Sequence, residues 1–130
     1  MRKWLWLDER EAIATHDRLM ILHGGITGLR DRELLLASLA RPQHLNTYNK
    51  GVDAATLAAA YTFAIVKNHP FADGNKRTGF VLGVLFLELN GARFTASEEA
   101  AALAVIKLAS EELDEAGYVA FLKANWVKQG

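Results

Sequence analysis

The stretch that decides the fold reads HPFADGNKR at residues 69–77 and lies between two strongly apolar segments. Pro70 disfavours helical dihedral angles at His69, so a helix that runs through residues 58–68 should end there. A Gly-Asn pair then permits a tight turn, and residues 78–90 are apolar and long enough for another helix. The sequence therefore predicts a polar loop held between two buried helices.

The beginning of the second of these helices is a candidate anion site. Unpaired backbone N–H groups at a helix N-terminus, together with the helix dipole, attract phosphate groups. Lys76 and Arg77 fall in the first turn, where the dipole disfavours cations. A phosphate bound between these side chains and the helix end would remove that conflict. The pattern therefore indicates phosphate binding.

Capping residues and apolar spacing predict the other helices. Asp8 with Glu11 opens a helix over about 9–22, and Asp31 opens one that ends before Pro42. Residues 43–50 show neither helical nor strand period, so we expect a long surface loop there. The remaining helix-opening residues are Asp53, Ser97, and Asp114 or Glu115.

These elements predict the fold class. A short extended segment over residues 4–7 should pack its tryptophans on the body, and no strand of useful length follows it. At 130 residues the chain is long enough for one hydrophobic core. We therefore expect a compact all-α bundle of about six helices that forms a single domain over residues 1–130.

Composition excludes several classes of protein. Fifteen Lys and Arg residues balance fifteen Asp and Glu residues, so no overall field favours nucleic acid or an anionic membrane. The absence of cysteine excludes disulfides and thiolate metal sites and agrees with a reducing cytosol. The apolar start meets Asp8 too soon for a signal peptide, and Glu88 interrupts the longest apolar run. We expect a cytoplasmic protein with no membrane or direct nucleic-acid contact.

The loop holds the groups that phosphoryl or nucleotidyl transfer requires. His69 is the residue in it that titrates near neutral pH, so it could accept a proton from a substrate hydroxyl. Asp73 offers a hard oxygen ligand, which with phosphate oxygens and waters is the usual way that Mg²⁺ is held. The sequence thus predicts a general base and a metal ligand four residues apart.

The rest of the loop suits a phosphate. Gly74 and Asn75, with the backbone N–H groups that follow them, can form a concavity that cradles phosphate oxygens. Lys76 is a point charge for one oxygen, and Arg77 can bind oxygens bidentately. Phe71 has the opposite character and is expected to anchor the loop in the core.

At these residues the sequence resembles the Fic/Doc family, whose signature is His-Pro-Phe-x-Asp-Gly-Asn-x-Arg. Lys76 stands where the adenylylating Fic enzymes have glycine, so the chain is more similar to the death-on-curing (Doc) toxin branch. Residues 23–31, HGGITGLRD, and residues 39–43, LARPQ, are also similar to Doc proteins. The resemblance therefore spans nearly the whole chain.

The resemblance implies a six-helix Fic/Doc fold in which His69 is the base and Asp73 binds Mg²⁺. Lys76, Arg77 and the backbone of residues 74–76 would hold the phosphates of ATP. In the Doc branch the nucleotide binds in the reverse orientation to that in adenylylating Fic enzymes. The resemblance thus implies a kinase that transfers the terminal phosphate of ATP to a Ser or Thr hydroxyl on translation elongation factor Tu and halts translation.

The resemblance also implies a protein partner. Fic proteins are commonly inhibited by a helix that carries Ser/Thr-x-x-x-Glu-Gly/Asn, and residues 95–100 come closest but end in Ala100. Inhibition would then come from a small Phd-type antitoxin whose tail folds along the toxin. His44 and Tyr48 fall where Fic proteins carry a flap that aligns the target peptide, so they are candidates for substrate docking as well as for plain surface loop.

Two other functions stay open on the sequence. The same fold could transfer AMP to a protein hydroxyl, or the chain could be a catalytically inactive Fic-fold binding subunit that acts through an antitoxin complex. Single residues also have simpler interpretations. His16 is interpreted as structural, and Lys67 is either a solvated lysine or a further contact for phosphate or a partner.

Overall fold

The computed structural model describes residues 3–129, which form six helices and two short strands. The helices are α1 (Glu9–His23), α2 (Arg32–Tyr48), α3 (Ala54–Asn68), α4 (Asn75–Leu89), α5 (Glu98–Ala109) and α6 (Glu115–Ala124). The strands are β1 (Ala92–Phe94) and β2 (Trp126–Lys128). The predicted all-α class with six helices is confirmed, and each predicted capping residue precedes a helix.

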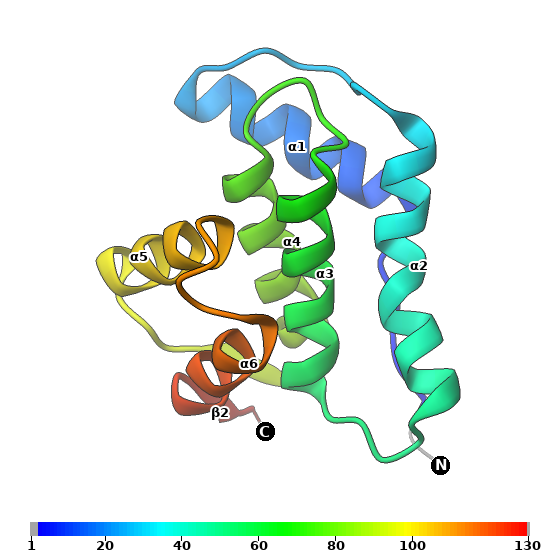
Figure 1. Ribbon diagram of the computed structural model, residues 1–130, viewed down its shortest axis with the longest axis vertical. Coiled ribbons are helices and arrows are strands. Elements are labelled where there is room, and N and C mark those ends of the chain that lie inside the picture. The colour runs from blue at the N-terminus through cyan, green and yellow to red at the C-terminus, as the bar shows by residue number, and fades with distance from the viewer. Residues whose placement is uncertain (1–2, 130) are drawn as a thin grey trace.

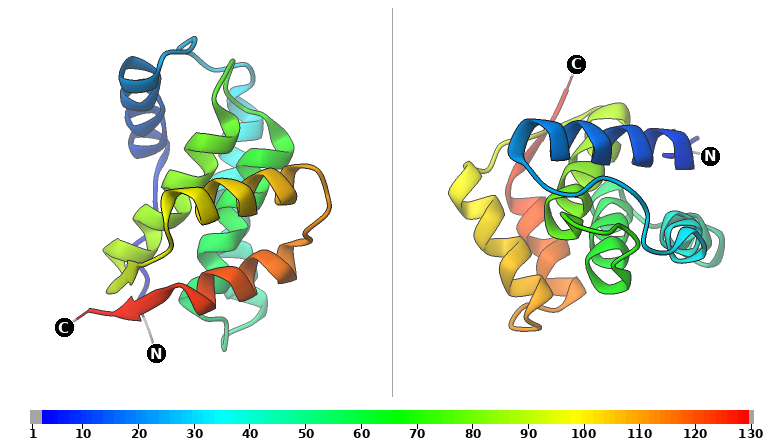
Figure 2. Two further views of the ribbon diagram at one scale, coloured as in Figure 1. Left: turned by 90° about the vertical axis from the view of Figure 1, so that its left-hand side faces the viewer. Right: turned by 90° about the horizontal axis from the view of Figure 1, so that it is seen from above.

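The antiparallel helices α3 and α4 form the centre of the molecule (Figure 1). In that view α2 stands on one side of the pair and α5 and α6 on the other, while α1 and the segment after it cross the end where α3 meets α4. Figure 2 shows the same arrangement from the side and from above. The loop at residues 69–74 therefore projects from the end of the two central helices.

The two central helices approach closely because α4 carries glycine where it crosses α3. A Cβ at Gly83 would lie 2.4 Å from Thr62 Oγ1 and 3.0 Å from the Ala58 carbonyl oxygen. Thr62 Oγ1 itself donates a hydrogen bond to the Gly79 carbonyl at 2.7 Å. Interior positions packed this tightly have no room for an added methyl group, so the crossing depends on these glycines.

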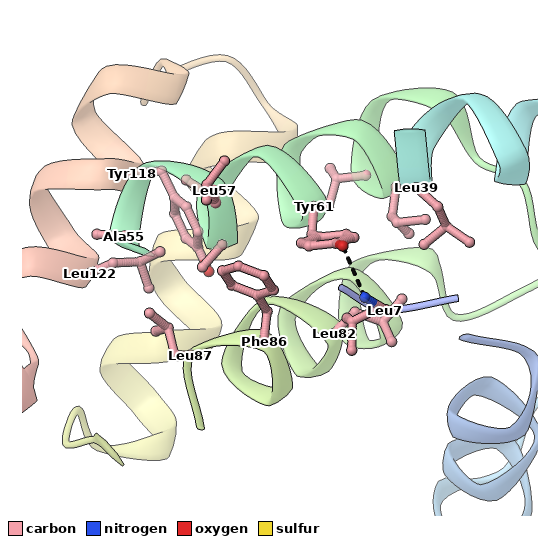
Figure 3. Close-up of a cluster of buried hydrophobic side chains, with 14 of the residues drawn as sticks. Leu7, Leu39, Ala55, Leu57, Tyr61, Leu82, Phe86, Leu87, Tyr118 and Leu122 are labelled. Atoms are coloured by element: carbon pink, nitrogen blue, oxygen red, sulfur yellow. Dashed lines mark hydrogen bonds between the residues drawn. The ribbon is translucent and has the colours of Figure 1, made fainter. Parts of the chain in front are cut away.

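The core lies between α3, α4 and the extended N-terminal segment (Figure 3). Trp4 and Trp6 lie against Phe86 with ring centroids 5.8 and 5.7 Å apart, which confirms the predicted packing of residues 4–7. The Leu7 N–H donates to the Tyr61 hydroxyl at 3.1 Å. Burial raises the pKa of Tyr61 to about 12 because the ionised phenolate would lose its hydration.

The prediction that the second helix ends before Pro42 is wrong, and so is the surface loop over residues 43–50. Pro42 lies inside α2, which continues to Tyr48, although a proline removes one helical hydrogen bond. Contacts with the rest of the molecule stabilise the helix beyond it. Arg41 forms a bidentate ion pair with Glu115 on α6 at 2.6 and 2.7 Å, Pro42 is buried, and Leu45 packs against the core.

The sequence predicts no strand of useful length after residue 7, and in the described part of the chain two strands of three residues each form one short pairing there. Ala92–Phe94 pairs antiparallel with Trp126–Lys128, with Phe94 opposite Trp126. Three-residue strands are too short to show an alternating pattern, and their partners are distant in sequence. The pairing places Trp126 in β2, after α6 has ended at Ala124.

Candidate functional site

The helix α3 ends at His69, which adopts a left-handed conformation with φ 51° and ψ 55°. This conformation is uncommon for a residue other than glycine. Arg30 holds it in place, since its Nε donates to the His69 carbonyl at 2.6 Å and its Nη2 to the Asn68 carbonyl at 2.8 Å. Arg30 thus satisfies carbonyl groups that the end of a helix leaves unpaired.

The His69 ring is exposed, and its Nδ1 lies 3.3 Å from the Lys67 carbonyl oxygen. A proton on Nδ1 would be donated to that carbonyl, which leaves Nε2 unprotonated. The geometry therefore suits a ring that accepts a proton at Nε2.

A glycine-rich segment over residues 24–31 runs beside the loop, as Figure 1 shows at the upper end of the molecule. Leu29 forms an isolated antiparallel bridge with Phe71. Three backbone hydrogen bonds join the two segments: Ala72 N–H to the Gly28 carbonyl at 3.0 Å, and Arg30 and Asp31 N–H to the Pro70 carbonyl at 2.7 and 3.0 Å. The sequence alone did not predict this contact. The three glycines at 24, 25 and 28, all with positive φ, are the feature of the sequence that could have indicated a backbone segment lying close to the loop.

The side chain of Asn75 secures the loop from the other side. Its Oδ1 accepts from the Phe71 N–H at 3.0 Å, and its Nδ2 donates to the Phe71 carbonyl at 3.0 Å. Asn75 and Phe71 are both buried. Both ends of the Asn75 amide therefore bond the loop backbone, and its main-chain N–H at the beginning of α4 remains to contact a ligand.

His16 also contacts the loop, which extends its predicted structural role. The ring is buried and stacks on Phe71, with centroids 4.0 Å apart and an interplanar angle of 7°. Its Nε2 lies 2.8 Å from the Asp73 carbonyl oxygen and donates to it in the matching tautomer. His16 is thus a positioning residue for the segment that carries Asp73.

The Asp73 carboxylate is exposed and each oxygen accepts one backbone hydrogen bond. Oδ1 accepts from Gly74 N–H at 2.8 Å and Oδ2 from Ile26 N–H at 3.1 Å. Carboxylate oxygens have further lone pairs, so a cation could still be bound. Within residues 3–129 no three His, Asp or Glu side chains gather as a metal cluster. The donor set therefore fits Mg²⁺ held by one carboxylate together with phosphate oxygens and waters.

The helix α4 begins without a side-chain cap. Its N-cap residue is Gly74, in a left-handed conformation with φ 69°, and no side-chain hydrogen bond closes the helix end. Lys76 and Arg77 are exposed in the first turn. Free N–H groups and two cations together make this helix end suited to an anion.

These groups share one groove of about 960 Å³. The loop forms one end of it, with His69, Asp73, Gly74, Asn75, Lys76 and Arg77 all lining the space. Its walls come from α4 and α5 and include Phe80, Val81, Val84, Ala101 and Val105. The structure therefore brings the predicted site residues of the loop together in one groove, whose remaining walls are mainly apolar and also include Glu88, Ser97 and Glu98.

Residues 6–87 match the Fic/DOC family. The chain belongs to the Fic/Doc family. It is 34% identical over 99 residues to the protein named protein kinase doc from Escherichia phage P1, which covers 76% of this chain and 79% of that protein. It is 41% identical over 80 residues to the protein named Toxin Doc from Mycolicibacterium smegmatis, which covers 58% of this chain and 59% of that protein. Both relatives support the predicted Doc branch.

The Fic/Doc groove does not include the two residues predicted for a substrate flap. His44 and Tyr48 lie in the last two turns of α2, which leads into the beginning of α3, whereas the loop follows the end of α3. The helix α3 has 15 residues, and a helix of that length spans about 22 Å. Because residues 43–48 are helical, they do not form a flap next to the loop, and the segment that does lie there is 24–31.

None of the helices within residues 3–129 combines the length and apolar character that crossing a membrane requires.

Proposed function

We propose that this protein is the toxin of a toxin–antitoxin pair and acts in the cytoplasm as a kinase. It transfers the terminal phosphate of ATP to a Ser or Thr hydroxyl on translation elongation factor Tu. The names of the two relatives support a toxin and a kinase. The observation that carries the proposal is that His69 and the uncapped beginning of α4 lie at the same end of one groove.

Each group in the loop has a role in this transfer. His69 Nε2 takes the proton from the acceptor hydroxyl, and the hydroxyl oxygen forms a bond to the γ-phosphorus. The bond between the γ-phosphorus and the oxygen that bridges it to the β-phosphorus breaks, and ADP leaves. The N–H groups of α4, with Lys76 and Arg77, bind the phosphate oxygens. Asp73 would hold Mg²⁺, which neutralises phosphate charge when bound. The apolar walls of the groove take the remainder of the nucleotide.

Lys76 favours a kinase over an AMP transferase. Its exposed ammonium adds a positive charge at the groove end, where a glycine would add none. An additional phosphate placed at the loop is stabilised by that charge. Lys76→Gly should therefore weaken phosphate transfer, and unchanged transfer would show that this lysine does not orient the nucleotide.

A Phd-type antitoxin is the proposed inhibitor. The candidate internal inhibitor over residues 95–100 does not have its family form, because Ala100 stands where the pattern requires Gly or Asn. In the structure this stretch opens α5, with Ser97 as the N-cap that accepts from the Ala100 N–H at 3.1 Å. An antitoxin segment that occupies the groove would exclude the nucleotide from the loop.

The test uses purified elongation factor Tu with ATP labelled at either the α- or the γ-phosphate. We expect label from the γ-position alone, dependent on Mg²⁺ and lost in His69→Ala. His44→Ala is the matched control, since it removes an exposed histidine far from the groove and should leave transfer unchanged. Label from the α-position would establish AMP transfer instead. If His69→Ala arrested growth as strongly as the parent, the chain would act as a binding subunit.

A further inference from the structure

A second, smaller hollow of about 170 Å³ adjoins His69. It lies between the ends of α3 and α5, and its apolar surface comes from Phe63, Val66, Leu108 and Ala109. His69 lines both this hollow, which we call the side pocket, and the groove. Nothing in the sequence pattern distinguishes these four apolar residues from residues that pack between helices.

The geometry of phosphate transfer gives a reason for the target chain to lie over the side pocket. The attacking and leaving oxygens lie roughly in line on opposite sides of the phosphorus. If the phosphates lie in the groove against α4, the acceptor hydroxyl approaches from the other side, within hydrogen-bond reach of His69. The residues next to that hydroxyl in the target chain are then held above the side pocket.

The chemistry of the side pocket selects an apolar occupant. Lys67 and Glu111 are exposed at its edge and carry opposite charges, so they give no net charge to attract an ion. The Phe63 ring already has two cations near it, with Lys67 Nζ 5.6 Å and Arg41 Cζ 5.3 Å from its centroid. The side pocket is an open hollow of about 170 Å³, and its apolar lining comes from Phe63, Val66, Leu108 and Ala109. A single aliphatic or aromatic side chain would fit.

The backbone around the side pocket is held in an unusual conformation. Among residues 3–129, two residues other than glycine have positive φ, His69 at 51° and Glu111 at 68°. Both line the side pocket. Such conformations cost free energy and gather at functional sites. Both residues lie at helix C-termini, where a left-handed residue commonly ends a helix, so the ends of α3 and α5 determine the shape of the hollow.

We propose that the side pocket binds an apolar side chain of the target protein that neighbours the acceptor hydroxyl, and so determines which hydroxyl is modified. This inference rests on the proposed transfer to a protein hydroxyl. It adds a specificity site that is separate from the nucleotide groove and from residues 24–31.

Ala109→Leu tests the inference, because Ala109 is exposed and an added isobutyl group would fill the hollow. Ala100→Leu is the matched control, an exposed alanine on the same helix that lines neither the groove nor the side pocket. Both variants should bind ATP with the Kd of the parent. With elongation factor Tu as the probe, Ala109→Leu should lower kcat/KM for transfer at least about tenfold, chiefly through KM, and Ala100→Leu should not.

A second measurement identifies the occupant. After the modified residue is mapped, each apolar residue of the target within three positions of it is replaced by Ala. One such replacement in the target should lower the rate of transfer by the parent enzyme about tenfold. The same replacement should not lower the rate of the Ala109→Leu enzyme any further, because both changes remove the same contact.

Equal transfer by Ala109→Leu and the parent, or additive effects in the paired variants, would overturn the side-pocket proposal alone. Absence of transfer by the parent from either label position would overturn the proposed function and this inference with it.

Discussion

Asn75→Ala removes the side chain that holds the loop over residues 69–74 in its conformation. The backbone hydrogen bonds between the loop and residues 24–31 are made by Pro70 and Ala72, so the N–H and C=O of Phe71 depend on Asn75. Each buried polar group left without a partner costs about 1–3 kcal/mol. Alanine has a higher helix propensity than asparagine, and this gain offsets well under 1 kcal/mol of that cost. We expect the free energy of unfolding to fall by about 2–5 kcal/mol, a large part of the total for a domain.

The assay is urea unfolding, followed in parallel with ATP binding. Lys76→Ala is the control, since the neighbouring side chain is exposed and should change stability by less than about 0.5 kcal/mol. It should instead weaken ATP binding about tenfold, because a charge that contacts phosphate is lost. If Asn75→Ala unfolded at the same urea concentration as the parent but lost ATP affinity, the Asn75 amide would be a ligand and the assignment of a structural clasp would be refuted.

Three further predictions follow from contacts outside the groove. Gly83→Ala should destabilise the protein by about 1–3 kcal/mol in thermal unfolding, because its Cβ would lie 3.0 Å from the backbone carbonyl of Ala58 in α3. Gly117→Ala should cost less, because its Cβ would meet side-chain atoms of Leu113 and Asp114 and no backbone. Arg30→Met should reduce the rate of transfer with little change in Tm, because it frees the backbone that fixes His69; an unaltered rate would count against this role. Burial raises the pKa of Tyr118 to about 12, so its neutral form stabilises the fold below pH 10 and that stability is lost as the pH rises toward 12. Tyr118→Phe should show a shallower loss of Tm above pH 10, and parallel curves would contradict the assignment.

Much of the fold could be predicted because its signals are local. Asp8, Asp31, Asp53, Ser97 and Asp114 each accept a hydrogen bond from a backbone N–H in the first turn of the helix that follows. The end of α3 before a proline and the beginning of α4 after a glycine are also properties of a few adjacent residues. Such local signals are readable without knowledge of the tertiary structure.

The failures of prediction have a common cause. The continuation of α2 through Pro42 depends on Glu115, which is 74 residues from Arg41 in sequence, and the pairing of β1 with β2 joins segments more than 30 residues apart. His16 and Arg30 hold the loop in place, but the residues next to them in the sequence do not indicate that they do so. Their roles arise only when α1 and the segment after it fold across the loop.

The sequence by itself determined the six helices and the polar loop between two apolar ones, because helix propensity, capping and proline act over a few residues. It also placed the residues proposed as base, metal ligand and phosphate contacts in one short stretch. The tertiary structure decided that the Asn75 amide serves the backbone, that residues 24–31 and not 43–50 lie beside the loop, and that a second hollow adjoins His69. Each of these depends on contacts between segments that are distant in the chain, and such contacts exist only after the core has formed.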